Sequence, residues 1–321
     1  MNGVLVVDKP GGITSFEVVR RIKRAAGVRR VGHGGTLDPM ATGVLPICLG
    51  EATKLAAFLL DGDKAYEATL AFGVETDTYD ADGAETRRAD ASAVTEAQVR
   101  DALVPFRGPI RQRPPVYSAL KRDGRPLYDY ARKGEAVEAP ERSVVIHDLA
   151  LLRFEGPAAV TLGVRCSKGT YIRSLAFDLG RALGPGAHLR ALRRTASGPF
   201  DLAAARPLTQ TIEALQGKRH DSGPVLLPLA DALGHLPRTI ADAPTALALR
   251  QGKKILWATL HLAEGIPEPP GRFLVIGPAG DLLAVAERQD DGRVHTLRVF
   301  NDTPAEPSGQ PRKNPSLSLT R

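Results

Sequence analysis

Residues 32–39, with the sequence GHGGTLDP, leave the backbone little choice of path. Glycines at 34 and 35 permit backbone angles that other residues avoid, and they let a ligand approach the main chain closely. Pro39 restricts the residue before it, Asp38, to extended backbone angles. The sequence therefore predicts a rigid loop that presents one carboxylate. Loops of this kind often carry function, although an isolated Asp more commonly caps a helix or makes an Asx-turn.

A helix is predicted shortly before this loop. Thr14 and Glu17 have the spacing of a capping box, in which two side chains satisfy backbone amides at the helix start. Helical periodicity then assigns an inward and an outward face. The inward face is predicted to hold Phe16, Val19 and Ile22, and the outward face Arg20, Arg21, Lys23 and Arg24.

Further along the chain, strand and helix patterns follow one another without an internal repeat. Tyr66 to Phe72 shows the two-residue alternation of a strand, and residues 95–106 have apolar side chains at helical spacing. Two apolar runs between 143 and 169 are predicted to pair as strands. Residues 170–183 are predicted as a helix that ends at Gly184. This mixture indicates an α+β fold.

The texture of the sequence changes at about residue 227, where short strands begin, separated by Gly and Asp-Gly turns. The last residues, from about Thr303, are rich in Pro, Ser and charge and contain little that can be buried, which predicts a disordered tail. We therefore expect three parts. They are a main domain at 1–235, a small β domain at 236–302 and the tail at 303–321.

Composition excludes several classes of protein. The 321 residues include 43 Lys and Arg against 36 Asp and Glu, a formal net charge of +7 that favours a polyanionic partner. Cys48 and Cys166 lie far apart in sequence, so neither a zinc site nor a disulfide framework is indicated, and a reducing cytoplasm fits. No apolar run approaches the ~18 residues of a membrane span, and the N-terminus has no signal-peptide pattern.

Three further patterns resemble known sites but lack residues that those sites require. TYDADG at 78–83 begins like a calcium loop, yet the first and twelfth positions, Thr78 and Ala89, are not carboxylates. KGT at 168–170 resembles part of a phosphate loop, but the glycine required upstream is missing. His33 has no second histidine nearby, so no metal site is predicted.

Three basic stretches favour a nucleic acid as the partner. They are RRIKRAAGVRR at 20–30, RQRPPVYSALKRDGR at 111–125 and HLRALRRT at 188–195. Cations interleaved with Tyr or His suit contacts to phosphates and bases. One further arginine, Arg173, can pair through two nitrogens with a carboxylate. From these residues alone, an RNA-acting enzyme and an RNA-binding protein both remain open.

Six motifs resemble the TruB family of bacterial tRNA pseudouridine synthases, in the family's order. They are KPGGITSFEVV (9–19), GHGGTLDPMATGVLPICLGEATKL (32–55), KAY (64–66), TDTYDADG (76–83), RPPVYSALKRDGRPLYDYARKG (113–134) and CSKGTYIRSLAFDLGRALGPGAHLRALRRTASGPF (166–200). The resemblance implies the pseudouridine synthase fold, a central mixed and mainly antiparallel sheet flanked by helices, over about two-thirds of the chain. The part from about 240 to 300 resembles a PUA-type domain, a small RNA-binding β-barrel.

The resemblance also implies a reaction at the T-loop uridine, position 55 of tRNA, without cofactor or metal. The uracil bond to nitrogen breaks, the base turns, and carbon is joined to the sugar. Asp38 matches the catalytic residue, Tyr66 the tyrosine that stacks on the flipped base, and Arg173 the arginine that pairs with the aspartate. Because an unperturbed Asp is ionised at neutral pH, Arg173 is better explained by orientation than by activation. Substrate contacts are implied for His33, Asp80, Tyr171 and Leu192.

The partner that the resemblance implies is the T stem-loop of tRNA. We expect a cytoplasmic monomer with no membrane and no obligate protein partner. A non-catalytic tRNA-binding or tRNA-folding protein on the same scaffold is the alternative, but such a protein would not require Asp38, Tyr66 and Arg173 together. The related guide-RNA-dependent synthases share the GTLDP loop. They are disfavoured because KPGGITS begins here at residue 9, without the long N-terminal extension expected of them.

Overall fold

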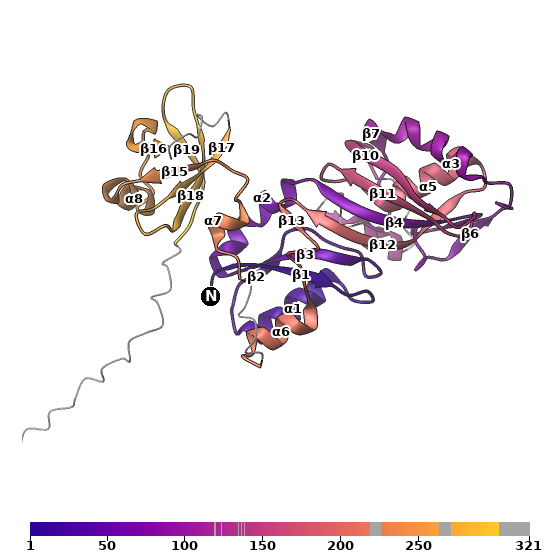
Figure 1. Ribbon diagram of the computed structural model, residues 1–321, viewed down its shortest axis with the longest axis horizontal. Coiled ribbons are helices and arrows are strands. Elements are labelled where there is room, and N and C mark those ends of the chain that lie inside the picture. The colour runs from indigo at the N-terminus through magenta and orange to yellow at the C-terminus, as the bar shows by residue number, and fades with distance from the viewer. Residues whose placement is uncertain are drawn as a thin grey trace, which may run out of the picture. The chain divides into compact units, whose positions relative to one another are not determined.

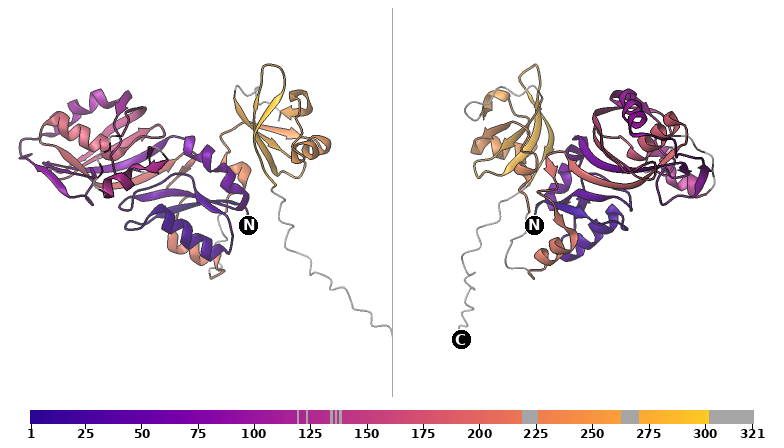
Figure 2. Two further views of the ribbon diagram at one scale, coloured as in Figure 1. Left: turned by 180° about the vertical axis from the view of Figure 1, so that it is seen from behind. Right: turned by 45° about the vertical axis from the view of Figure 1, so that its right-hand side comes forward.

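The computed structural model (Figures 1 and 2) describes residues 1–118, 120–122, 124–133, 135, 137, 139–218, 226–262 and 271–301. The described chain divides into two compact units, one of residues Met1–Leu233 and one that begins at Gly234. Each unit has its own hydrophobic core. The predicted tail at 303–321 lies outside the described residues, and the three-part division of the chain stays a prediction.

The first unit is built on one ten-stranded sheet. Its order is β14-β1-β3-β12-β4-β11-β10-β7, with β2 paired to β3 and β13 paired to β12. The strands are β1 (Gly3–Lys9), β2 (Val31–His33), β3 (Thr42–Leu49), β4 (Lys64–Phe72), β7 (Gly108–Gln112), β10 (Arg142–Phe154), β11 (Val160–Cys166), β12 (Ala187–Ser197), β13 (Phe200–Asp201) and β14 (Arg206–Pro207). Only the β1–β14 and β3–β12 pairs within this sheet are parallel. The sheet is therefore mixed and mainly antiparallel, as predicted.

Helices and two small hairpins complete the unit. The helices are α1 (Ser15–Ala26), α2 (Ala56–Asp61), α3 (Glu96–Leu103), α4 (Leu127–Arg132), α5 (Ile172–Leu183), α6 (Leu208–Leu215) and α7 (Leu229–Ala232), with short 3₁₀ turns at η1 (Gly50–Leu55) and η2 (Val104–Phe106). The hairpins pair β5 (Val74–Thr76) with β6 (Glu85–Arg88) and β8 (Lys121–Arg122) with β9 (Arg125–Pro126). Figure 1 shows α1 beside α6, and α3 beside α5. Within the described chain, no helix is both long and apolar enough to cross a membrane.

Helix α1 buries Val19 and Ile22 as predicted but differs from its prediction at Phe16. The Thr14 hydroxyl accepts a hydrogen bond from the Glu17 amide at 3.0 Å, but the Glu17 carboxylate binds two arginines instead of completing a capping box. The prediction that Phe16 faces inward is wrong, because Phe16 is 73% exposed. Ser15 is buried in its place, since its hydroxyl bonds the backbone of Leu37. That contact sets the rotation of the helix.

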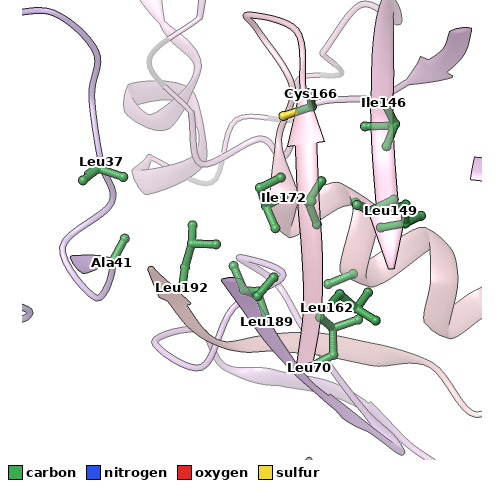
Figure 3. Packing of buried hydrophobic residues seen from close by; sticks show 14 of the residues in the cluster. Leu37, Ala41, Leu70, Ile146, Leu149, Leu162, Cys166, Ile172, Leu189 and Leu192 are labelled. Atoms are coloured by element: carbon green, nitrogen blue, oxygen red, sulfur yellow. The ribbon is translucent and has the colours of Figure 1, made fainter. Parts of the chain in front are cut away.

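The core of the first unit extends into the loop that carries Asp38, called here the Asp38 loop (residues 34–41). Leu37 and Ala41, on either side of Asp38, are 4% and 0% exposed and belong to the main hydrophobic cluster. Figure 3 shows these two side chains near Leu192 of β12. A fully buried leucine contributes about 1.5–3 kcal/mol, so the Asp38 loop is anchored by packing as well as by hydrogen bonds.

The second unit is a five-stranded sheet with its own helix. The sheet has the order β16-β15-β17-β18-β19, in which only β15 and β17 are parallel. Its elements are β15 (Arg238–Ala241), α8 (Ala243–Arg250), η3 (Trp257–Thr259), β16 (Leu260–Leu262), β17 (Arg272–Ile276), β18 (Leu282–Arg288) and β19 (Val294–Val299). Phe273 is fully buried, and the Trp257 ring meets it edge-on with centroids 5.2 Å apart. The small β domain predicted from the strand texture is therefore present.

Gly43, at the start of β3, is predicted to be the least replaceable glycine beside the Asp38 loop. Its φ is +103°, and an added Cβ would collide with the backbone carbonyl of Arg194 on the paired strand β12. Gly43→Ala should lower the free energy of unfolding by at least about 2 kcal/mol, measured by urea denaturation. Gly27→Ala is the matched control, because Gly27 has φ +63° but open space around it. Equal losses in the two variants would contradict the predicted collision.

Candidate active site

Asp38 lies between β2 and β3 at the surface of the first unit. Its side chain is 34% exposed, although Leu37 and Ala41 of the same loop are buried. The Asp38 carbonyl accepts a hydrogen bond from the Ala41 amide at 3.1 Å, which closes a tight turn through Pro39. The loop thus turns back immediately after the carboxylate.

Arg173 approaches the Asp38 carboxylate through two nitrogens. Arg173 is in the first turn of α5, and its side chain is 7% exposed. Nη2 donates a hydrogen bond to Oδ1 at 3.1 Å, and Nε lies 3.0 Å from Oδ2 without hydrogen-bond alignment. Two contacts to the two oxygens fix the plane of the carboxylate. The structure therefore brings together two residues that the sequence analysis paired.

A turn after β5 holds Arg173 from its other side. Nη1 of Arg173 donates to the Thr78 carbonyl at 3.1 Å and lies 3.5 Å from Asp80 Oδ2. Asp80 is 5% exposed, and its Oδ1 accepts hydrogen bonds from the Thr78 hydroxyl at 2.6 Å and from the Asp82 amide. The Tyr117 carbonyl accepts a further bond from Nη2, at 3.0 Å. Asp80 was predicted as a substrate contact, and in the structure its carboxylate faces Arg173.

The charge balance of the site refines the role expected for Arg173. Burial raises the pKa of the Asp38 carboxyl above its usual range, Arg173 acts to lower that pKa, and the negative charge of Asp80 adds to the rise. A partly desolvated carboxylate loses hydration that its charged form needs. Arg173 therefore supports the ionised state of Asp38 as well as its orientation. From the sequence, orientation was the better explanation of Arg173.

Lys9, the last residue of β1, holds the Asp38 loop through backbone carbonyls. It is fully buried, and its Nζ donates hydrogen bonds to the carbonyls of Pro39 at 3.1 Å, Ala41 at 2.6 Å and Pro10 at 2.9 Å. Burial lowers the pKa of Lys9 to about 8, with the Asp38 charge opposing that change and Arg194 adding to it. The ammonium thus binds the loop just after Asp38, at the carbonyls of Pro39 and Ala41.

Arg194 of β12 holds the other end of the same loop. Its side chain is almost fully buried, and it donates to the carbonyls of Gly35 at 3.1 Å, Thr36 at 3.2 Å and Val44 at 2.7 Å. In the sequence, Arg194 belongs to a basic stretch whose pattern predicts phosphate contacts. For this residue that interpretation is wrong, because its guanidinium is inside the protein. No local pattern distinguishes it from the exposed Arg190 nearby.

The N-terminus of α1 adds a third attachment. The Ser15 hydroxyl donates to the Leu37 carbonyl at 3.1 Å and accepts from the Leu37 amide at 2.8 Å. The Gly12 amide donates to the Pro39 carbonyl at 2.9 Å. Both neighbours of Asp38 are therefore bound by α1 and the turn before it. The KPGG and TS segments belong to a motif of the sequence, but the motif does not predict that they hold the Asp38 loop.

Tyr66 and Leu192 come from adjacent strands of the sheet. Tyr66 of β4 is half-buried and stands in register with Arg194 of β12. Burial raises the pKa of the Tyr66 hydroxyl, with Arg194 acting to lower it and the Asp38 charge adding to the rise. Leu192 is 7% exposed and faces the Asp38 loop (Figure 3). The predicted pocket residues Tyr66 and Leu192 thus adjoin the loop.

Tyr171 and His33 lie at the margins of this group. Tyr171 directly precedes α5, and its backbone exchanges two hydrogen bonds with the Gln112 side chain, at 2.8 and 3.0 Å. Nδ1 of His33 accepts a 3.4 Å hydrogen bond from the Gly35 amide. Burial and the charge of Arg194 lower the pKa of His33, which favours a neutral ring at neutral pH. In the part of the chain that the structure describes, no group of His, Cys, Asp and Glu suits a metal ion.

Comparison with known protein families identifies the class of this fold and site. Residues 23–172 match the model of the TruB family pseudouridylate synthase (N-terminal domain), and residues 173–234 match the tRNA pseudouridylate synthase B C-terminal domain. The protein is thus a pseudouridylate synthase, an isomerase. The chain belongs to the TruB family.

Individual relatives agree over most of the length. A tRNA pseudouridine synthase B of Aromatoleum aromaticum is 52% identical over 253 residues, 79% of this chain and 80% of that protein. A tRNA pseudouridine synthase B of Pseudomonas aeruginosa is 44% identical over 308 residues, 94% of this chain and 96% of that protein.

Solved structures confirm the predicted fold class, a pseudouridine synthase fold with a PUA-like β domain. A crystal structure of a Cbf5-Nop10-Gar1 complex superposes with a TM-score of 0.72 at 29% identity, over 93% of this chain and 84% of that chain. An H/ACA ribonucleoprotein bound to a substrate RNA that contains 2′-deoxyuridine gives a TM-score of 0.71 at 26% identity, over 94% and 85%.

The charge balance of the site predicts how the titration of Asp38 responds to its neighbours. Arg173→Gln should raise the Asp38 pKa, because it removes the cation that favours the carboxylate. Asp80→Asn should lower the Asp38 pKa, because it removes a like charge. The measurement is a ¹³C NMR titration of protein labelled at the Asp carboxyl, with the Asp38 signal assigned by its loss in Asp38→Asn. An unchanged pKa in Arg173→Gln would contradict the described charge balance.

Proposed function

We propose that this protein converts the T-loop uridine at position 55 of tRNA to pseudouridine, with Asp38 as the catalytic carboxylate. The bond from uracil N1 to the ribose C1′ breaks, the base turns, and a bond from C5 to C1′ forms. The proton leaves C5 and a proton is gained at N1, so the product is an isomer of the substrate. The balance requires no cofactor, oxidant or reductant.

The observation that carries this proposal is the held position of Asp38. Two nitrogens of Arg173 stand 3.0 and 3.1 Å from its two oxygens, and its loop is fixed by three attachments. A carboxylate ordered before substrate arrives can attack an electrophilic carbon or move a proton without rearrangement of its surroundings. The intact pair disfavours the alternative of a non-catalytic tRNA-binding protein on this scaffold.

Reaction at a stacked uridine requires that the base leaves its stack. Flipping costs a few kcal/mol, which binding energy from the rest of the RNA must offset. We assign Tyr66 as the ring that stacks on the flipped uracil, where stacking contributes about 1–3 kcal/mol. Its place beside the Asp38 loop, in electrostatic range of Asp38, supports this role. Leu192 and Tyr171 would line the same pocket, and Asp80 would act through Arg173.

His33 would act on the RNA beside the flipped nucleotide. Its ring is partly exposed at the start of the Asp38 loop, and the Gly35 amide orients it through Nδ1. A neutral imidazole oriented in this way offers its other nitrogen and a flat face to the RNA.

The partner that we propose is the T stem-loop of tRNA, bound by a cytoplasmic monomer without an obligate protein partner. The relatives from Aromatoleum and Pseudomonas carry the name tRNA pseudouridine synthase B. The formal charge of +7 suits a polyanion, and exposed basic residues occur along α1.

Asp38→Asn should abolish pseudouridine formation and leave tRNA affinity nearly unchanged. Asn preserves the shape of the side chain but removes its negative charge, so turnover should fall by at least about a thousandfold. Affinity should stay within about threefold, because the amide perturbs few ground-state contacts. Carbodiimide mapping of a T stem-loop transcript measures the product, and filter binding measures affinity. Retained turnover in this variant would exclude Asp38 as the catalytic residue.

Tyr66→Ala should impair catalysis more than stability. Loss of the stacked ring should slow single-turnover conversion by about 5- to 100-fold, while urea denaturation shows a smaller change, since Tyr66 packs against the edge of the hydrophobic cluster and is not one of its fully buried members. Tyr66→Phe is the matched control, because it retains the ring and removes the hydroxyl. A single-turnover rate near that of the wild type in Tyr66→Ala would rule out the stacking role.

A further inference from the structure

Phe16 is a large aromatic side chain held in solvent at the start of α1. At 73% exposure it contrasts with Val18, Val19 and Ile22 of the same helix, which are buried. Single exposed apolar residues are common on protein surfaces. Exposure alone is therefore no evidence that Phe16 binds a ligand. Phe16 also lies near the Asp38 loop, and its helix is rich in cations.

The position of Phe16 is beside the catalytic loop. Ser15, directly before it, makes two hydrogen bonds with the backbone of Leu37, the residue that precedes Asp38. Gly12 bonds Pro39, the residue that follows Asp38. Phe16 directly follows Ser15, and consecutive Cα atoms are about 3.8 Å apart. Ser15 in turn contacts Leu37, which directly precedes Asp38. Phe16 therefore lies close to the Asp38 loop, with its side chain exposed to solvent.

The charge around Phe16 is positive. Helical spacing of four and seven residues places Arg20 and Lys23 on the same exposed face as Phe16. The acid of this helix, Glu17, is bound by Arg20 and Arg21 at 2.7 Å each, and these bonds lower its pKa to about 2. Cations outnumber this single acid along α1. An exposed ring among cations matches the chemistry of single-stranded RNA, whose bases stack and whose phosphates attract Lys and Arg.

We infer that Phe16 is a stacking platform for an unpaired nucleotide of the substrate RNA that lies next to the target uridine, with Arg20 and Lys23 facing the backbone phosphates. Tyr66 receives the flipped uracil inside the site, and Phe16 receives a neighbouring base outside it. The inference rests on the proposed function, since it takes the substrate to be an RNA loop. Phe16 contributes to binding and does not touch the reacting atoms.

The first test separates binding from chemistry. Phe16→Ala should raise the KM for a T stem-loop transcript by about 5- to 100-fold and leave kcat within about twofold. Phe16→Tyr should retain the wild-type KM, because every aromatic ring can stack, whereas Phe16→Leu should resemble Phe16→Ala. Val104→Ala is the matched control, because Val104 is 59% exposed in η2 of the same unit. Thermal unfolding should be unchanged in all four variants.

The second test detects the stacking contact directly. The chain has one tryptophan, Trp257 of the second unit, so Phe16→Trp adds a single reporter. Titration of Phe16→Trp in an Asp38→Asn background with T stem-loop RNA should quench fluorescence well beyond the change seen with Phe16 intact. Val104→Trp in the same background should show no added quenching.

The outcomes distinguish this inference from the proposed function. A wild-type protein that forms no pseudouridine contradicts the proposed function, while the fluorescence titration needs no turnover. An active wild-type protein with an unchanged KM in Phe16→Ala and no added quenching in Phe16→Trp overturns the inference and leaves the proposed function standing. A protein partner on Phe16 would produce that same pair of results.

Discussion

Two buried cations hold the backbone on which Asp38 depends. Lys9 binds two carbonyls just after Asp38, and Arg194 binds carbonyls at the start of the loop and in β3. A charge inside a protein is costly unless polar groups surround it. The carbonyls supply those groups. Few other conformations of the loop would keep both cations hydrogen-bonded, so the cations restrict the loop to its observed conformation. The order of the active site is thus coupled to the solvation of two side chains.

The rest of the site is arranged around this fixed loop. Arg173 comes from α5 and meets the loop at Asp38, while the turn that contains Thr78 and Asp80 holds Arg173 from behind. That turn is itself attached to α5 a second time. Tyr79 has the unusual φ of +65°, and its ring stacks on Phe177 with centroids 4.1 Å apart. The pair of Asp38 and Arg173 is therefore held from two sides.

The sequence predicted much of the fold and the central pair of the site, for identifiable reasons. Strand alternation and helical spacing are local patterns, and Asp38 and Arg173 belong to motifs with a known chemistry. The first turn of α1 was mispredicted because Ser15, a polar residue, is buried through a bond to a segment that is distant in sequence, while Phe16 is exposed. The roles of Lys9 and Arg194 were not predicted because their partners are also distant in sequence. Those partners are main-chain carbonyls, which leave no side-chain pattern in the sequence.

The use of main-chain carbonyls has a consequence for how this site can be moved or altered. The bonds of Lys9 and Arg194 depend on the backbone path of the loop and not on the identity of its side chains. Thr36 could therefore be replaced without loss of the bond between its carbonyl and Arg194. The converse also holds. Residues 34–41 transplanted alone into another scaffold would lack both cations, and the grafted aspartate would be an ordinary acid on an unheld loop. Part of the information for the loop's shape therefore resides outside the loop, in β1 and β12.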